Sequence, residues 1–315
     1  MAVSTTTTAN DITYSAVIEP TFLDYAYDWM VAQQFCRPFS LIGKPSNALD
    51  IPIPTANTGT VGDGGSGVDT EYDATQATDL STPLTWGTDK VTVTCSEYAL
   101  LRTLTDNIGE DAVPGLDFLG TCLRDSARCL MLALEDDICA LFASLSNTVG
   151  STGVDLTVAQ TLAAQVGIRK RGNRAPDGVV YILDEQQVDD LEAALIAVGS
   201  SWTSYPGGAD RLLGVDKTAN NGMGNGHVMN FRGFPVYSAG LTDTANAGAD
   251  VVGACFTPTS PGNDPHATYA LVDKRPFRME PQRDASLRAT EMVFSMRKGV
   301  AEIRDSSGTA IITDA

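Results

Sequence analysis

A continuous apolar stripe, long enough for a single extended helix, constrains this chain more than any other feature. Apolar residues between 116 and 145 recur at steps of three or four, namely Leu116, Leu119, Leu123, Ala127, Leu130, Leu134, Ile138, Leu141 and Leu145. This spacing places them on one face of an α-helix. Pro114 suits the first turn, and Ser146–Gly150 supplies a stop signal. The pattern predicts a helix over about 114–146, roughly 45 Å long and well above average length.

The opposite face of the predicted helix is charged. It carries Asp117, Arg124, Asp125, Arg128, Glu135, Asp136 and Asp137. We expect this face to meet water or a partner. The three adjacent carboxylates are interpreted as a solvated surface, because neighbouring helix positions point about 100° apart and do not converge on one site.

Two alternating runs enclose a long segment, 55–83, that contains almost no core-forming residues and is rich in Gly, Asp and Thr. The first run is a predicted strand, and its prolines predict an edge strand because they cannot donate ladder hydrogen bonds. Loops of this length usually serve a function or are disordered. We expect a hairpin arm that reaches a neighbouring molecule, with a merely floppy loop as the alternative. The alternating apolar residues are Leu49, Ile51 and Ile53 before the segment, and Leu84, Trp86, Val91, Val93 and Cys95 after it.

From Gly153 onward, predicted helices and strands alternate, which is typical of an α/β domain with a central sheet. The two helices carry Val158, Leu162 and Val166, and Val188, Leu191, Leu195 and Val198; the strands lie at 179–183, 231–237 and 251–256. The end of the chain returns to strands at 268–272, 290–296 and 300–303. We expect these last strands to pair beside the long helix, so that this part is discontinuous in sequence.

Composition limits the classes of partner. The chain has 21 basic and 39 acidic residues, a net charge of −18, whereas a nucleic-acid binder needs a cationic surface. A negatively charged shell that encloses DNA without binding it tightly fits this charge balance. The alternative is that the acidic charge only keeps an abundant protein in solution. No stretch approaches the ~20 apolar residues that span a bilayer. The start of the chain also lacks the pattern of a secretory signal, so we expect no membrane contact.

The sequence contains no recognisable pattern of catalytic or metal-binding residues. The six cysteines lack zinc-site spacing and are interpreted as small core residues. The two histidines, His227 and His266, are expected in exposed loops. The glycines of a dinucleotide-binding loop lie between a strand and a helix. No such arrangement is predicted around Gly222, Gly224 and Gly226. The basic run 169–174 is interpreted as an exposed turn, with phosphate binding as the alternative. We therefore expect no catalytic activity, cofactor or metal.

The order of these parts resembles the tailed-bacteriophage major capsid protein of the HK97 fold. The stretch FRGFPVYSAG (231–240) looks like a Gly-x-Pro-Val strand common in that family, and 270–281 and 288–305 look like its closing strands. The resemblance implies an α+β fold with an inserted α/β domain. Its parts would be an N-terminal arm (1–48), a long β-hairpin E-loop (49–95), a P-domain (96–152 and 266–315) with the spine helix at about 114–146 and antiparallel strands, and an α/β A-domain (153–265).

The resemblance also implies a function. The chain would assemble in the host cytoplasm into hexamers and pentamers of an icosahedral virion shell that encloses double-stranded DNA without sequence-specific binding. A portal and a separate scaffolding protein would be partners, with or without a decoration protein. No lysine lies between Asp50 and Asp89, so we expect a shell without covalent links through the E-loop. The alternatives are an encapsulin-like bacterial compartment and, more remotely, an α/β enzyme with an unrecognised site.

Charge suggests how neighbouring subunits meet. The E-loop is acidic, while the segment 274–304 is crowded with basic residues. We expect the acidic loop of one subunit to lie across the basic segment of the next. Exposed ion pairs contribute only ~0–1 kcal/mol each, so they would set the register of the contact rather than its strength. The residues expected to take part are Asp63, Asp69, Glu71 and Asp73 on the loop, and Arg124, Arg128, Arg275, Arg278, Arg283 and Arg288 on the receiving surface.

Overall fold

The computed structural model describes residues 30–54, 60–61, 65–66, 88–107, 118–171, 178–199, 226–259 and 266–315. Several predictions of the sequence lie outside these ranges. They are the arm before residue 30, the acidic residues Asp63, Asp69, Glu71 and Asp73, the start of the long helix at Pro114, and the glycines at 222 and 224. In the described part of the chain, no helix is long and apolar enough to cross a membrane.

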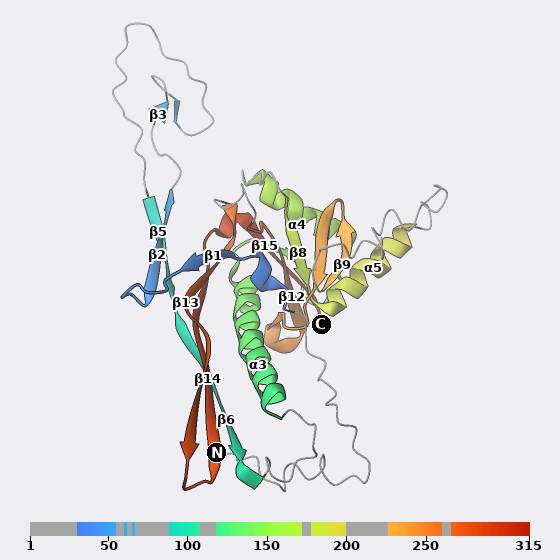
Figure 1. Cartoon of the computed structure of the whole chain (residues 1–315). Coiled ribbons are helices and arrows are strands. Elements are labelled where there is room, and N and C mark those ends of the chain that lie inside the picture. Colours follow the sequence, from blue (N-terminus) through green and yellow to red (C-terminus); the bar gives the residue numbers. More distant parts are fainter. Residues whose placement is uncertain are drawn as a thin grey trace, which may run out of the picture.

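The body of the molecule consists of two sheets with one helix between them (Figure 1). The long sheet has the order β1–β13–β14–β6. Its strands are β1 (Arg37–Ser40), β6 (Ser96–Thr105), β13 (Tyr269–Asp284) and β14 (Ala289–Glu302). The helix α3 (Phe118–Ala140) continues into a short 3-10 helix, η2 (Leu141–Ser144).

The second sheet has seven strands in the order β7–β15–β12–β8–β10–β9, with β11 paired to β12. Its central strand β8 is buried on both sides. Val180 and Ile182 enter the core shared with α3 and the long sheet, while Tyr181 and Leu183 enter a second core under α4 and α5. The elements are β7 (Thr148–Gly150), α4 (Val158–Lys170), β8 (Val180–Leu183), α5 (Glu185–Gly199), β9 (His227–Phe231), β10 (Phe234–Ser238), β11 (Asp243–Ala245), η3 (Asn246–Gly248), β12 (Asp250–Phe256) and β15 (Gly308–Asp314).

A two-stranded hairpin projects from the body (Figure 1). It consists of β2 (Ala48–Pro54) and β5 (Thr88–Thr94). Among the described residues β2 pairs with β5 alone, as expected for an edge strand that contains Pro52 and Pro54. A third core holds the base of the hairpin against β13; it contains Leu41, Ile51, Val93, Cys95, Ala270 and Val272. Farther out, β3 (Thr60–Val61) pairs with β4 (Gly65–Ser66).

The predicted stripe on the long helix is confirmed in its second half. Leu130, Leu134 and Ile138 are buried in the core between the sheets, but Leu123 is exposed. The α-helix ends at Ala140, earlier than predicted, and the tighter turn of η2 rotates the chain. Phe142, rather than Leu141, therefore becomes fully buried.

Other local predictions need correction. In α4 the buried residues include Thr161, Ala164 and Ile168, whereas Val166 of the predicted stripe is exposed. The run 231–237 is two antiparallel strands, β9 and β10, because Arg232 and Gly233 both have positive φ and form a tight turn.

Two strands of the structure, β6 and β15, are not among those predicted from the sequence. The predicted P-domain ranges include β7 and β15, but both strands lie in the seven-stranded sheet.

Candidate assembly surfaces

The projecting hairpin is held by polar contacts across its two strands. Lys90 Nζ lies 2.7 Å from Asp50 Oδ2, and Thr92 Oγ1 donates a hydrogen bond of 2.6 Å to Asp50 Oδ1. These bonds, that of Lys90 first, hold the pKa of Asp50 below its usual value, and the Asp50 carboxylate raises the pKa of Lys90. Lys90, the one lysine in the predicted E-loop, is therefore engaged within its own chain.

Four of the six arginines expected to receive a neighbour lie on the long sheet or in its β13–β14 turn. Three of these four have acidic partners in the same chain. Arg275 pairs with Glu97. Arg278 lies 2.6 Å from Glu280. Arg283 binds both carboxylate oxygens of Asp106, at 2.5 and 2.6 Å, which lowers the pKa of that carboxyl.

The fourth arginine, Arg288, lies in the turn between β13 and β14 with a φ of 48°. Its carbonyl oxygen accepts a 3.0 Å hydrogen bond from the backbone nitrogen of Asp106. Arg283 and Arg288 thus both contact Asp106, which follows the end of β6. This one residue links β6 to β13 and to the β13–β14 turn at the far end of the long sheet. The predicted arginines are spread along the sheet rather than gathered at one site, because β13 and β14 are extended strands.

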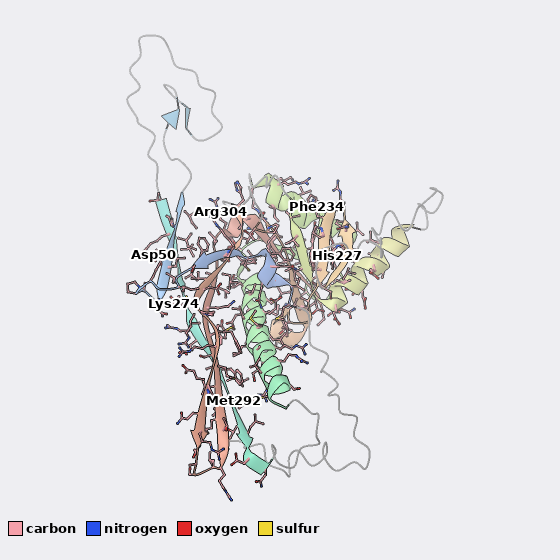
Figure 2. All side chains as sticks on the ribbon, viewed as in Figure 1. Asp50, His227, Phe234, Lys274, Met292 and Arg304 are labelled. Carbon is pink, nitrogen blue, oxygen red and sulfur yellow. The ribbon has the colours of Figure 1, made fainter. Side chains whose placement is uncertain are left out.

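Two further cations at the foot of the hairpin have neutral partners. Lys274 Nζ lies 3.4 Å from the carbonyl oxygen of Leu41 and also contacts that of Lys44. Arg297 Nη2 lies 2.5 Å from Asn47 Oδ1, and its Nε is buried without a hydrogen-bond partner. Figure 2 shows Lys274 on β13 close to the hairpin that carries Asp50. We call Lys274 and Arg297 the hairpin-base cations. Lys44, whose carbonyl oxygen contacts Lys274, is a further cation beside them. The sequence pattern does not single it out, because it stands apart from the basic segment 274–304.

The charged face of α3 is more constrained than its sequence suggests. Arg124 is exposed and Arg128 is half-buried. Asp125 forms an ion pair with Arg102 of β6. Asp137 accepts a hydrogen bond from the Tyr98 hydroxyl. The pKa of Tyr98 is raised, mainly by burial and to a lesser extent by this hydrogen bond. This face thus fixes α3 against β6 through polar contacts.

The prediction that Glu135 is solvated is wrong. Its side chain is fully buried. One carboxylate oxygen accepts hydrogen bonds from the backbone nitrogens of Val31 (2.6 Å) and Ala32, and the other from that of Gln33 (3.2 Å). Burial raises the pKa of Glu135, and these backbone donors offset the effect in part. Sequence could not reveal this contact, because the donors are backbone groups about one hundred positions away.

Neither histidine is an exposed loop residue. His227 opens β9, is half-buried, and packs its ring edge-on against Tyr237 at 5.4 Å; Figure 2 shows it on the seven-stranded sheet. His266 is also half-buried. The predicted basic turn begins inside α4, whose last residues are Arg169 and Lys170.

Arg171, which follows α4, donates to the carbonyl oxygen of Gly308 at 2.9 Å and to Thr309 Oγ1 at 2.5 Å. Its role is therefore to join α4 to β15, so the exposed-turn interpretation is wrong for this residue. Within the described ranges, no group of three or more His, Cys, Asp or Glu residues is arranged to hold a metal ion.

Comparison with solved structures identifies the fold. A chain of Mycobacterium phage Che8 is 14% identical with a TM-score of 0.65, and the match covers 94% of this chain and 96% of that one. The capsid of the native GTA particle is 12% identical with a TM-score of 0.64, and the match covers 100% of both chains. The capsid of Myoviridae phage XM1 is 7% identical with a TM-score of 0.61, covering 94% and 96%.

These matches confirm the predicted fold as that of phage capsid proteins. No family model and no curated relative matches the chain by sequence.

Proposed function

We propose that this chain, which has the fold of phage capsid proteins, is the major shell subunit of a tailed-phage virion. Copies of it assemble in the host cytoplasm into hexamers and pentamers and close into an icosahedral shell around double-stranded DNA. The observation that carries the proposal is the match over 100% of both chains to the GTA capsid. A likeness over the whole chain includes the projecting hairpin, the long helix and both sheets, and not merely one common domain.

We assign the predicted parts to structural units as follows. The E-loop is the segment 49–95, whose base is the β2–β5 hairpin. The P-domain is α3 with the long sheet, and the A-domain is the seven-stranded sheet with α4 and α5. The strands β7 and β15 lie in this second sheet, so the chain passes from one unit to the other several times.

We assign the contact between neighbouring subunits to attraction between oppositely charged surfaces. The acidic loop of one subunit, with Asp63, Asp69, Glu71 and Asp73, lies across the basic surface of the next. Because Arg275, Arg278 and Arg283 have acidic partners in their own chain, an incoming carboxylate has to compete for them. The hairpin-base cations Lys274 and Arg297 bind neutral oxygens instead, and a carboxylate forms stronger hydrogen bonds with a cation than a neutral acceptor does.

The contact is tested by charge reversal. The triple variant Asp69→Lys, Glu71→Lys and Asp73→Lys should block or misdirect assembly, as seen by light scattering and electron microscopy. A matched control, Asp136→Lys, Glu185→Lys and Asp189→Lys, changes the same number of charges at exposed helix positions and should assemble normally. Normal shells from the first variant would refute the contact, and equal failure of both would show that only net charge matters.

The shell is proposed to close without covalent links through the hairpin. Lys90 is the one lysine of the segment 49–95, and its ammonium group is paired with Asp50. A portal and a separate scaffolding protein are the proposed partners. Denaturing electrophoresis of purified particles should give one band at the mass of a single chain, and a ladder of heavier species would contradict this part of the proposal.

A further inference from the structure

One stretch of the described chain connects every unit of the subunit, and we call it the strap (residues 30–44). It begins with the short 3-10 helix η1 (Ala32–Phe35). The start of η1 is anchored on α3, because Glu135 accepts the backbone hydrogen bonds of Val31, Ala32 and Gln33. The side-chain amide of Gln33 adds a 3.0 Å bond to the carbonyl oxygen of Met131, also on α3.

The middle of the strap is fixed to the seven-stranded sheet. The ring of Phe35 lies 4.9 Å from that of Tyr237 on β10 and 6.4 Å from that of Phe256 on β12, measured between centroids. The carbonyl oxygen of Phe35 accepts a 2.9 Å hydrogen bond from the backbone nitrogen of Thr259, just after β12. The aromatic contacts are of the tilted and edge-on kinds that stabilise protein cores.

The last part of the strap joins the long sheet. β1 pairs in parallel with β13, from Arg37 opposite Ala270 to Ser40 opposite Asp273. The backbone nitrogen of Leu41 then donates a 2.8 Å bond to the carbonyl oxygen of Asp273, and Leu41 is buried in the core at the foot of the hairpin. The hairpin itself begins four residues after the strap, at Ala48.

The strap therefore has the N-terminal 29 residues on one side and the β2–β5 hairpin on the other. We propose that the strap fixes the directions in which these two segments leave the body, with Glu135 as its anchoring residue, and that assembly depends on this anchor more than subunit folding does. The inference rests on the proposed function, because it concerns segments through which subunits would meet.

The identity of residue 135 supports this role. A fully buried carboxylate is costly, and a well-packed apolar side chain at such a position is often at least as stabilising. Unlike an apolar residue, Glu135 holds three consecutive backbone N–H groups in one specific arrangement. Glu135 is thus a positioning residue, since it sets where η1 sits.

The first experiment measures hydrogen exchange of the unassembled subunit. In Glu135→Gln the amide protons of Val31, Ala32 and Gln33 should exchange roughly 10- to 100-fold faster, because the neutral amide oxygen accepts weaker hydrogen bonds than a carboxylate does and the NH2 group accepts none, while α3 and both sheets keep their protection. The control Asp136→Asn changes an exposed carboxylate on the same helix and should leave these rates unaltered. Unchanged exchange at residues 31–33 in Glu135→Gln would overturn the anchoring role.

The second experiment compares assembly by electron microscopy. Glu135→Gln should fold but give few or irregular shells, and Phe35→Leu, which weakens the strap at its other contact, should give the same defect with Glu135 intact. Regular shells from both variants would overturn the inference. Failure of the unsubstituted protein to assemble would instead count against the proposed function, and the exchange rates would still decide whether Glu135 anchors the strap.

Discussion

Gly299 of β14 lies so close to Thr94 at the end of β5 that a methyl group on Gly299 would be 2.6 Å from the Thr94 carbonyl oxygen. No real side chain tolerates this distance to a backbone atom. The base of the projecting hairpin therefore rests directly on the backbone of the long sheet. This position requires glycine because of a close approach, and not because of an unusual backbone angle.

Replacing Gly299 should consequently be destabilising. Gly299→Ala forces β5 away from β14, and overpacking of this kind costs about 1–3 kcal/mol. Chemical denaturation of the subunit measures the change. Gly167→Ala is the matched control, since a methyl group there meets its nearest atom at 3.8 Å inside α4; it should raise the free energy of unfolding by about 0.4–1 kcal/mol. Equal behaviour of the two variants would contradict the close packing.

The buried carboxylate of Glu135 predicts a pH dependence of stability. Burial raises its pKa above the usual 4.5, so the folded subunit holds this proton more tightly than the unfolded chain. The resulting stabilisation is complete below the usual pKa and is lost as pH rises through the raised value. Around the carboxylate, the thiols of Cys36 and Cys139 stay protonated because burial raises their pKa.

Denaturation of the unsubstituted subunit and Glu135→Gln between about pH 4 and pH 8 isolates this effect. The free energy of unfolding of the unsubstituted protein should fall relative to that of the variant as pH rises. Glu302, whose pKa is also raised by burial, is present in both proteins and cancels in the comparison. A difference that does not change with pH would show that burial does not raise the pKa of Glu135.

Gln187 should be among the most sensitive polar residues of the seven-stranded sheet. It is fully buried, and its amide donates to the carbonyl oxygen of Ile311 at 3.0 Å and to Thr313 Oγ1 at 2.8 Å. Gln187→Ala leaves these acceptors buried and unpaired, which costs about 1–3 kcal/mol. The exposed neighbour Gln186 is the control, and Gln186→Ala should stay within about 0.5 kcal/mol. Denaturation curves that shift equally would refute the assignment.

The hairpin-base cations should matter more for assembly than a cation that already has an acidic partner. Lys274→Gln and Arg297→Gln should each slow the growth of light scattering, and added salt should reduce the difference from the unsubstituted protein. Arg278→Gln should have a smaller effect, because Arg278 is paired with Glu280. A larger effect of Arg278→Gln than of Lys274→Gln and Arg297→Gln would indicate that the acidic loop instead contacts the arginines farther along β13.

The sequence predicts what depends on local periodicity. The spacing of Leu130, Leu134 and Ile138 predicts the buried side of α3, and Val188, Leu191 and Leu195 predict that of α5. It fails where position is decided by distant segments. β15 follows β14 directly in sequence but pairs with β12 and β7 in the other sheet, and nothing within 308–314 indicates that choice.

The charged residues show the same limit. The acidic and basic segments are visible in the sequence, but whether an arginine is already paired is not. Glu97 and Asp106, which bind Arg275 and Arg283, lie almost 180 positions away in the chain. Glu135 was misassigned because periodicity assumes that charge faces solvent, whereas backbone N–H groups of η1 make its burial possible.

Electron microscopy of the purified protein, with sedimentation of the same sample, decides whether this chain is a shell subunit. A shell subunit should form rings of five or six copies and closed particles of megadalton mass with icosahedral symmetry, in which the β2–β5 hairpin of one subunit overlies the long sheet of the next. A protein that remains a small oligomer at every concentration, with neither rings nor shells, would contradict the proposed function.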